Sequence, residues 1–376
     1  MNEFNQLIDK LSASYVERRE TIEALVAAII ARRHVALIGP PGTAKSALIR
    51  DLAAGLGDLE YFSWLLTEFS VPEELFGPLD ISALEHGQYR RLTQGKLPEA
   101  ELTFIDEVFK AGPAILNTML SLMQERLFYN NGTPTKTPLV SLIGASNEVP
   151  TGEQALEALW DRFTIRLEVS YIRDRSNFTR MMTGSVGGMT ALLNREELED
   201  AQEAAATVDV PGGTLDAIVR IREALSERGI VASDRRYKES LDILKAMAFL
   251  DGRTQVAEDD LLVYQHILWH DPSQAAEVAK LVFSVAEPLL VAVTEIEDEA
   301  LDAVKEVRQV LADGDIAGAE ESQKLLESIS RLKEAKQKLG QLADQVAGST
   351  RAEEKIDEAA ERIKGWQTEA MKALGV

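Results

Sequence analysis

The sequence predicts an α/β core with a mostly parallel sheet, then an all-α lid, then a C-terminal antiparallel helical hairpin or bundle. Three observations predict this. Short apolar runs alternate with helical spacings as far as about residue 170. Helical spacing then continues without strands, and a seven-residue apolar repeat fills the last eighty or so residues. We therefore expect three domains, at residues 1–170, 171–293 and 294–376.

The first domain begins with a helix expected over residues 14–33. Apolar runs at 34–38, 102–105 and 139–145 are the expected strands, and residues 46–56 return to helical spacing. Two segments, 71–98 and 130–138, interrupt this alternation. Both are rich in glycine, proline or asparagine, so we predict two hairpin insertions.

The later domains carry helix signals. Asn194 with Glu197 predicts a capping box for a helix over 195–207, and Ser233 can cap a helix that runs to residue 247. Thr350 with Glu353 predicts a second capping box. The heptad positions expected in the C-terminal core are Ala300, Val304, Val307, Leu311, Leu325, Ile329, Leu332, Lys336, Leu339, Ala343, Val346, Ala352, Ile356, Ala359, Ile363, Trp366, Ala370 and Ala373.

Composition excludes several classes of protein. The formal net charge of −22 disfavours binding to nucleic acid, because an acidic chain repels phosphate backbones. Cysteine is absent, which excludes disulfides and thiolate–metal sites. Residues 1–10 do not read as a secretory signal, and the apolar run 25–30 is too short to cross a bilayer. We expect a cytoplasmic protein without membrane insertion.

A glycine-rich turn lies between an expected strand and an expected helix. Its residues are Gly39, Pro40, Pro41, Gly42, Thr43, Ala44, Lys45, Ser46 and Ala47. Backbone N–H groups in such a turn cradle phosphates, a lysine reaches the β- and γ-phosphates, and a serine hydroxyl binds Mg²⁺. Ala44 departs from the usual glycine before the lysine, and we expect it to be tolerated at a helix start. The turn predicts binding of ATP or ADP with Mg²⁺.

Two adjacent carboxylates follow the strand expected at 102–105. Asp106 and Glu107 would lie at the carboxyl edge of the sheet, where open α/β folds bind ligands. We expect Asp106 to hold Mg²⁺ together with Ser46, and Glu107 to polarise the water that attacks the γ-phosphate.

At this point the sequence resembles the AAA+ ATPases, which share the P-loop NTPase fold. Residues 39–46 and 104–110 resemble the Walker A and Walker B motifs of that family. Residues 71–79, 145–150 and 159–163 resemble signatures of its MoxR branch, and residues 233–236 are similar to the RavA-like subgroup. The resemblance covers about residues 14–271.

The resemblance implies further site residues. Asn147 matches sensor 1, which positions the attacking water. Arg162 matches an arginine finger that reaches the nucleotide of a neighbouring subunit, with Arg166 and Arg173 as lesser candidates. Arg235 matches sensor 2 on the lid, which contacts nucleotide in its own subunit, and Arg236 is the alternative.

The resemblance also implies partners. It implies a ring of identical subunits, expected to be a hexamer, with chaperone-like activity on a protein client. It implies a separate protein with a von Willebrand factor A domain, and it makes the two insertions candidates for substrate contact. RavA-type proteins resemble this chain in their C-terminal helices, but their founding member carries an extra β-rich module in that region. Residues 295–376 show no strand-rich insertion, so we do not expect the partners that such a module recognises.

Three other functions fit parts of the sequence. The same loop could serve a phosphotransferase with a small acceptor, or a nucleotide-gated scaffold that hydrolyses little ATP. A nucleic-acid motor is disfavoured by the acidic charge. His266 and His270 lie one helical turn apart, but we interpret them as ordinary helix residues, because the sequence suggests no third metal ligand.

Overall fold

The structure is a computed structural model that describes residues 3–150, 154–183, 188–313, 319–343 and 350–373. The chain forms two compact units, Met1–Val282 and Phe283–Val376. The expected core and lid therefore share one unit. The second unit begins before residue 294, the boundary we expected, because Leu290 and Val293 already belong to its apolar core.

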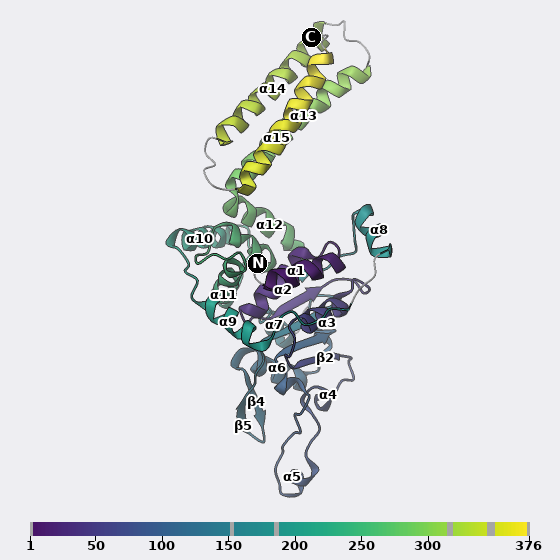
Figure 1. Ribbon diagram of the computed structural model, residues 1–376, viewed down its shortest axis with the longest axis vertical. Helices are drawn as coiled ribbons and strands as arrows, with labels where there is room; N and C mark the ends of the chain where they lie inside the picture. Colours follow the sequence, from purple (N-terminus) through teal and green to yellow (C-terminus); the bar gives the residue numbers. More distant parts are fainter. Residues whose placement is uncertain (1–2, 151–153, 184–187, 314–318, 344–349, 374–376) are drawn as a thin grey trace. The chain divides into compact units, whose positions relative to one another are not determined.

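A five-stranded sheet forms the centre of the first unit (Figure 1). Its strands, in spatial order, are β2 (Tyr61–Leu65), β3 (Leu102–Asp106), β6 (Ser141–Ser146), β1 (Val35–Ile38) and β7 (Ile165–Glu168). Every neighbouring pair is parallel, which confirms the predicted sheet type. All strands therefore end at one edge, called here the carboxyl edge, and begin at the opposite amino edge.

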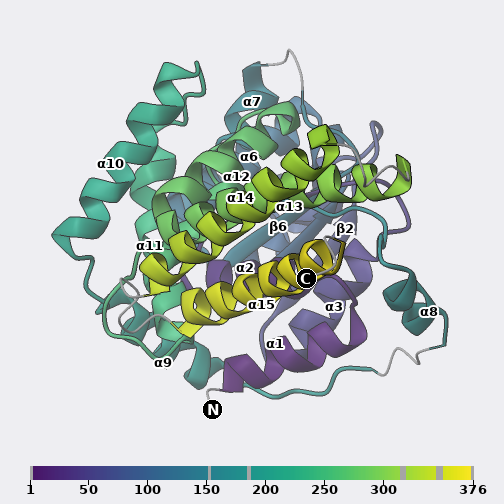
Figure 2. The ribbon, with the colours of Figure 1, turned by 90° about the horizontal axis from the view of Figure 1, so that it is seen from above.

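Helices cover both faces of this sheet. Figure 2 shows α1 (Glu3–Ser14) and α3 (Lys45–Gly55) on one side of β2 and β6, and α6 (Pro113–Glu125) and α7 (Gln154–Trp160) on the other. The single helix expected over 14–33 is shorter, because α2 spans Arg19–Ile30 and the backbone turns at Glu17, whose φ is +59°. Full burial of β1 and β6 explains why both read as mostly apolar runs in the sequence.

The two insertions differ in structure. Strands β4 (Leu127–Asn130) and β5 (Thr133–Lys136) form an antiparallel hairpin, with Asn131 and Gly132 both left-handed at the turn. The other insertion is not the hairpin that we predicted. It contains α4 (Pro72–Phe76), α5 (Ile81–Glu85) and the 3-10 turn η1 (Leu97–Glu99), and its two arms meet at one bridge.

Side chains of the hairpin turn join the two insertions. Asn130 Oδ1 accepts from Arg91 N at 2.7 Å, and Asn131 Oδ1 accepts from Tyr89 N at 2.8 Å. Asn130 Nδ2 also donates to Arg91 O at 3.1 Å. Backbone groups that a full hairpin would satisfy by pairing are thus satisfied by asparagine amides.

The remainder of the first unit is helical. It contains the short turns η2 (Val108–Lys110) and η3 (Asp259–His266), the helices α8 (Arg175–Thr183), α9 (Arg195–Ala206), α10 (Gly212–Glu227) and α11 (Asp234–Leu250), and the part of α12 (Pro272–Ala286) that ends at Val282. The capping box predicted at Asn194 and Glu197 is present in both directions. Ser233 caps α11 as predicted, since its Oγ accepts from Arg236 N at 3.3 Å. Among the residues that the structure describes, no helix is both long and apolar enough to cross a bilayer.

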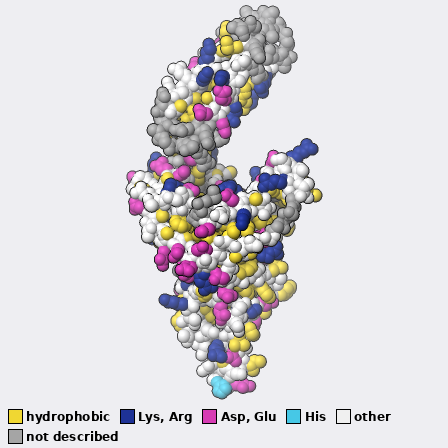
Figure 3. Space-filling view, viewed as in Figure 1, with side chains coloured by type: hydrophobic (Ala, Val, Ile, Leu, Met, Phe, Trp, Pro, Cys, Tyr) yellow, Lys and Arg dark blue, Asp and Glu magenta, His cyan; other side chains and the backbone are white. Residues whose placement is uncertain are grey.

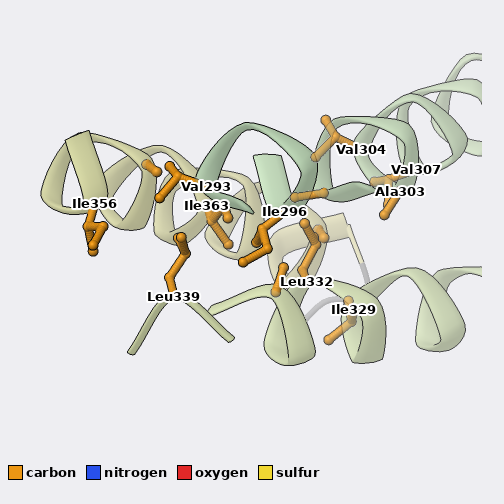
Figure 4. Packing of buried hydrophobic residues seen from close by; sticks show 14 of the residues in the cluster. Val293, Ile296, Ala303, Val304, Val307, Ile329, Leu332, Leu339, Ile356 and Ile363 are labelled. Atoms are coloured by element: carbon orange, nitrogen blue, oxygen red, sulfur yellow. The ribbon is translucent and has the colours of Figure 1, made fainter. Parts of the chain in front are cut away.

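The second unit is a three-helix bundle of α13 (Pro288–Asp313), α14 (Ala319–Ala343) and α15 (Thr350–Ala373), which pack on one another. Figure 4 shows its apolar core, with Ile296, Leu332 and Ile363 near the centre. Most of the expected heptad positions are buried there. Lys336 and Ala343 are instead exposed, and Ala335 takes the core position beside Lys336. Leu311, Leu325, Val346, Ala352, Ala373 and the Thr350–Glu353 capping box lie outside the described side chains.

Candidate functional site

The glycine-rich turn leaves the end of β1 and enters α3. Gly39 has no room for a side chain, because a Cβ there would lie 2.1 Å from Val169 O at the end of the adjacent strand. Gly42 has φ +80°, a conformation that favours glycine. Ala44 also has a positive φ, +63°, at the N-cap of α3. Ala44 is therefore left-handed, and the glycine usual at this position would relieve a local strain of roughly 1 kcal/mol.

Lys45 lies inside this turn and is almost fully buried. Its Nζ donates to Gly39 O at 2.6 Å and to Pro40 O at 3.0 Å. Burial lowers the pKa of Lys45, and the nearby carboxylates of Asp106 and Glu107 oppose that effect. The ammonium thus stands at the centre of the loop, where phosphate oxygens would replace two neutral carbonyls as its acceptors.

Ser46 and Asp106 meet across the end of the sheet. Ser46 Oγ donates to Asp106 Oδ2 at 3.0 Å. Within the described part of the chain, no three His, Cys, Asp or Glu side chains gather as a self-contained metal site. One hydroxyl and one carboxylate fit Mg²⁺, which keeps waters and takes phosphate oxygens for the rest of its coordination shell.

Glu107 is held from two sides. Its Oε1 accepts from Asn147 Nδ2 at 2.7 Å, and its Oε2 lies 3.5 Å from Lys110 Nζ. Its backbone is left-handed, with φ +53°, which is costly for a non-glycine residue and is typical of functional sites. The carboxylate is therefore fixed in direction by an amide that follows β6 and an ammonium in η2.

The parallel topology explains why these residues meet. Asp106 is the last residue of β3, Glu107 and Asn147 directly follow β3 and β6, and Lys45 follows the loop after β1; these three strands are neighbours in the sheet. The structure brings all of the predicted Walker and sensor 1 residues to the carboxyl edge. Sequence reasoning assigned no role to Lys110, although its place three residues after Glu107 was a signal.

The arginines lie elsewhere. Arg162 precedes β7, so it lies at the amino edge. Its guanidinium donates to Ala158 O at 2.6 Å and to Gln124 Oε1 at 2.7 Å. Burial and the charge of Arg235 lower the pKa of Arg162. Both acceptors are uncharged, so a phosphate would be a stronger partner for this cation.

Arg235 lies on the same side as Arg162. Its Nη1 is 3.7 Å from Asp161 Oδ2, and the neighbouring α11 residue Glu239 accepts from Thr164 Oγ1 at 2.8 Å, immediately before β7. We expected Arg235 over the phosphate loop of its own chain, and this placement contradicts that. Four residues of β1 and β7 separate the two edges, about 13 Å at the rise of a strand.

The alternative arginines have other surroundings. Arg166 is fully buried, stacks 4.1 Å from the Trp160 ring centroid and donates to the carbonyl oxygens of Trp160 and Trp269. Arg236 is also buried and donates to Ile267 O and Trp269 O. Both hold the fold together rather than reach outward. Arg173 follows β7 and its side chain is exposed.

The two histidines of interest do not share a helix as we expected, because His266 is the last residue of η3 and His270 lies between η3 and α12. His266 Nε2 lies 2.9 Å from Glu20 Oε1. The pKa of His270 is lowered by burial and by Arg166 and Arg236. Neither belongs to a group of metal-ligating side chains among the described residues.

The phosphate loop, the paired Ser46 and Asp106, and the oriented Glu107 on a parallel sheet define an α/β P-loop protein of the AAA+ ATPase class. Residues 2–206 match a family described as the MoxR domain in the MoxR–vWA–β-propeller ternary systems, and residues 213–282 match an AAA lid domain. The chain belongs to the MoxR family of AAA+ ATPases. The RavA-like subgroup stays a prediction.

Individual relatives agree with this assignment. An uncharacterized protein of Methanocaldococcus jannaschii is 33% identical over 96% of both chains. The chaperone MoxR1 of Mycobacterium tuberculosis is 25% identical over 68% of this chain and 71% of its own. The solved structure of a putative ATPase from Cytophaga hutchinsonii has a TM-score of 0.60 at 20% identity, and covers 76% of this chain and 93% of that one, which supports the fold.

Proposed function

We propose that this chain hydrolyses ATP with Mg²⁺ at contacts between identical subunits of a ring, expected to be a hexamer, and uses the energy to remodel or mature a protein client. One observation carries the proposal. The phosphate loop and Arg162 lie at opposite edges of one sheet, so Arg162 cannot reach the nucleotide of its own chain. An arginine of this kind completes a site only when a second copy supplies it.

Each residue has a role in this scheme. The loop and Lys45 bind the triphosphate, and Ser46 with Asp106 would hold Mg²⁺, which would polarise the phosphate oxygens. Glu107 takes up the proton of the attacking water, and the amide of Asn147 keeps its carboxylate aimed. Arg162 of a neighbouring copy stabilises the charge that develops on the γ-phosphate. Arg235 lies near Arg162, so we assign it to that same neighbouring site instead of its own.

The client would meet the two insertions. Several large apolar side chains there are exposed, and exposed apolar surface of this kind is typical of sites that bind other proteins. They are Ile81, Leu84, Tyr89, Leu92 and Tyr129. Figure 3 shows hydrophobic side chains at the end of the first unit that α4, α5 and the β4–β5 hairpin form.

Other partners follow from the family. The matched family model is named for systems that contain a vWA protein, so we propose that such a protein is encoded separately and works with this one. The net charge of −22 makes nucleic acid an unsuitable client. The cytoplasmic location stays a prediction.

The test is ATP turnover per chain as a function of protein concentration, with assembly followed by light scattering. We expect turnover to rise through the assembly range, and Arg162→Ala to lower it roughly 10³-fold with ATP binding retained. Undiminished turnover by a verified monomer would contradict the proposal. Phosphate transfer only with an added acceptor would support a phosphotransferase, and binding without turnover in the presence of client would support a scaffold.

A further inference from the structure

Asp161 has contacts that the proposed chemistry does not explain. It lies in the turn between α7 and β7, directly before Arg162. Its Oδ1 accepts from Ser233 Oγ at 2.8 Å and lies 3.4 Å from Arg236 Nε, and its Oδ2 lies 3.7 Å from Arg235 Nη1. One half-buried carboxylate thus contacts three side chains at the start of α11, those of Ser233, Arg235 and Arg236.

Ser233 connects Asp161 to the N-terminus of α11. The same Oγ that donates to Asp161 accepts from Arg236 N, the backbone group that a helix N-terminus must satisfy. A carboxylate at this place is also favoured by the partial positive charge of the helix N-terminus. Asp161 therefore holds the first turn of the lid helix against the turn that carries Arg162.

Charge balance strengthens the case. Arg162, Arg166, Arg235 and Arg236 all lie near this turn. Burial is the main cause that lowers the pKa of Arg162, and the positive charge of Arg235 lowers it further. Burial and the charge of Arg236 lower the pKa of Arg166 in the same way. The carboxylate of Asp161 opposes both shifts. Asp161 therefore offsets a repulsion that would otherwise separate the arginines.

We propose that Asp161 is a positioning residue, which ties α11 to the Arg162 turn and so holds Arg162 and Arg235 as one group directed at the nucleotide of a neighbouring copy. The inference rests on the proposed function. It implies that α11 and Arg162 move together, because one carboxylate connects them. It also implies that Asp161 is needed by the neighbour's ATP site and not by its own, since the loop of its own chain lies at the other edge.

A mixing experiment tests this. Asp161→Ala has an intact phosphate loop, and Lys45→Ala has intact arginines. We expect each variant alone to lose at least tenfold in turnover. Mixed in equal amounts, they should regain about a quarter of the wild-type turnover per chain, the fraction of head-to-tail contacts that pair a working loop with working arginines.

Controls separate this from a folding defect. Asp161→Ala should bind Mg-ATP with wild-type affinity by calorimetry. Asp161→Asn keeps an acceptor for Ser233 and should lose less turnover than Asp161→Ala. Asp234→Asn makes the same charge change one residue after Ser233, where the side chain is 93% exposed, and should leave turnover unchanged.

Three results would overturn the inference. Wild-type turnover by Asp161→Ala would do so directly. A second such result is a mixture of Asp161→Ala with Lys45→Ala whose turnover is only the sum of the two variants' own turnovers, while a mixture of Arg162→Ala with Lys45→Ala recovers turnover. Asp161 would then serve its own chain, and the proposed function would stand. If the Arg162→Ala mixture also fails to recover, the proposed function fails, and this inference fails with it.

Discussion

We predict that the side-chain amide of Asn147 supports ATP turnover through its hydrogen bond to Glu107. Asn147→Ala removes the 2.7 Å hydrogen bond to Glu107 Oε1 and leaves the phosphate loop and Ser46 intact. A hydrogen bond to a charged group contributes about 1.5–3 kcal/mol, which corresponds to roughly a 10- to 150-fold loss of turnover if it is used fully in the transition state. ATP affinity should change little, because Asn147 makes no contact with the loop in the described structure.

Lys110 supplies the matched comparison. It approaches the other oxygen of Glu107 at 3.5 Å, but its side chain is half exposed. Exposed ion pairs contribute about 0.2–1 kcal/mol, so Lys110→Ala should lower turnover by less than about fivefold. Steady-state phosphate release with saturating Mg-ATP, together with calorimetric ATP binding, measures both variants. Equal losses for the two variants, or unchanged turnover for Asn147→Ala, would refute the role assigned to the amide.

Three more changes test separate parts of the structure. Ser46→Ala should raise the Mg²⁺ concentration for half-maximal turnover roughly tenfold, the effect of about 1.4 kcal/mol, and an unchanged Mg²⁺ dependence would remove Ser46 from the metal site. His34 is buried, and this burial lowers its pKa well below the usual range. The positive charges of Arg126 and Arg33 lower the pKa further. His34 alone should therefore lower the free energy of unfolding by up to about 1.4 kcal/mol per pH unit as pH falls below about 6.5, and His34→Asn should reduce the slope of wild type in urea unfolding between pH 7 and 5.5. Leu332→Ala, at a fully buried position in α14, should cost about 3 kcal/mol, whereas Leu326→Ala, 59% exposed on the same helix, should cost under about 0.5 kcal/mol; similar urea midpoints for both would contradict the described bundle core.

The sequence predicted most of the carboxyl edge. Strands β1, β3 and β6 are short, mostly apolar and buried runs, and their last residues had to meet once the sheet was parallel. Strand β7 escaped prediction because it contains Arg166. That arginine is tolerated inside only because Trp160 and Trp269, more than a hundred residues apart, stack on it and offer carbonyl oxygens.

The position of Arg235 could not be predicted from local sequence. Its helix was predicted correctly from Ser233, but which edge of the sheet the helix meets depends on contacts with Asp161 and Thr164 far along the chain. The prediction of a hairpin at residues 71–98 was wrong for a similar reason. Asn130 and Asn131 satisfy its backbone from another segment, so it does not need the strand pairing that its turn residues suggested.

ATP binding measured beside phosphate release, on the same samples of wild type, Lys45→Ala and Glu107→Gln, tests the site most directly. Wild type should bind Mg-ATP and release phosphate. Glu107→Gln should bind with similar affinity and release almost none, and Lys45→Ala should give no binding heat. Undiminished binding by Lys45→Ala, or wild-type phosphate release by Glu107→Gln, would show that these residues do not act together on one triphosphate.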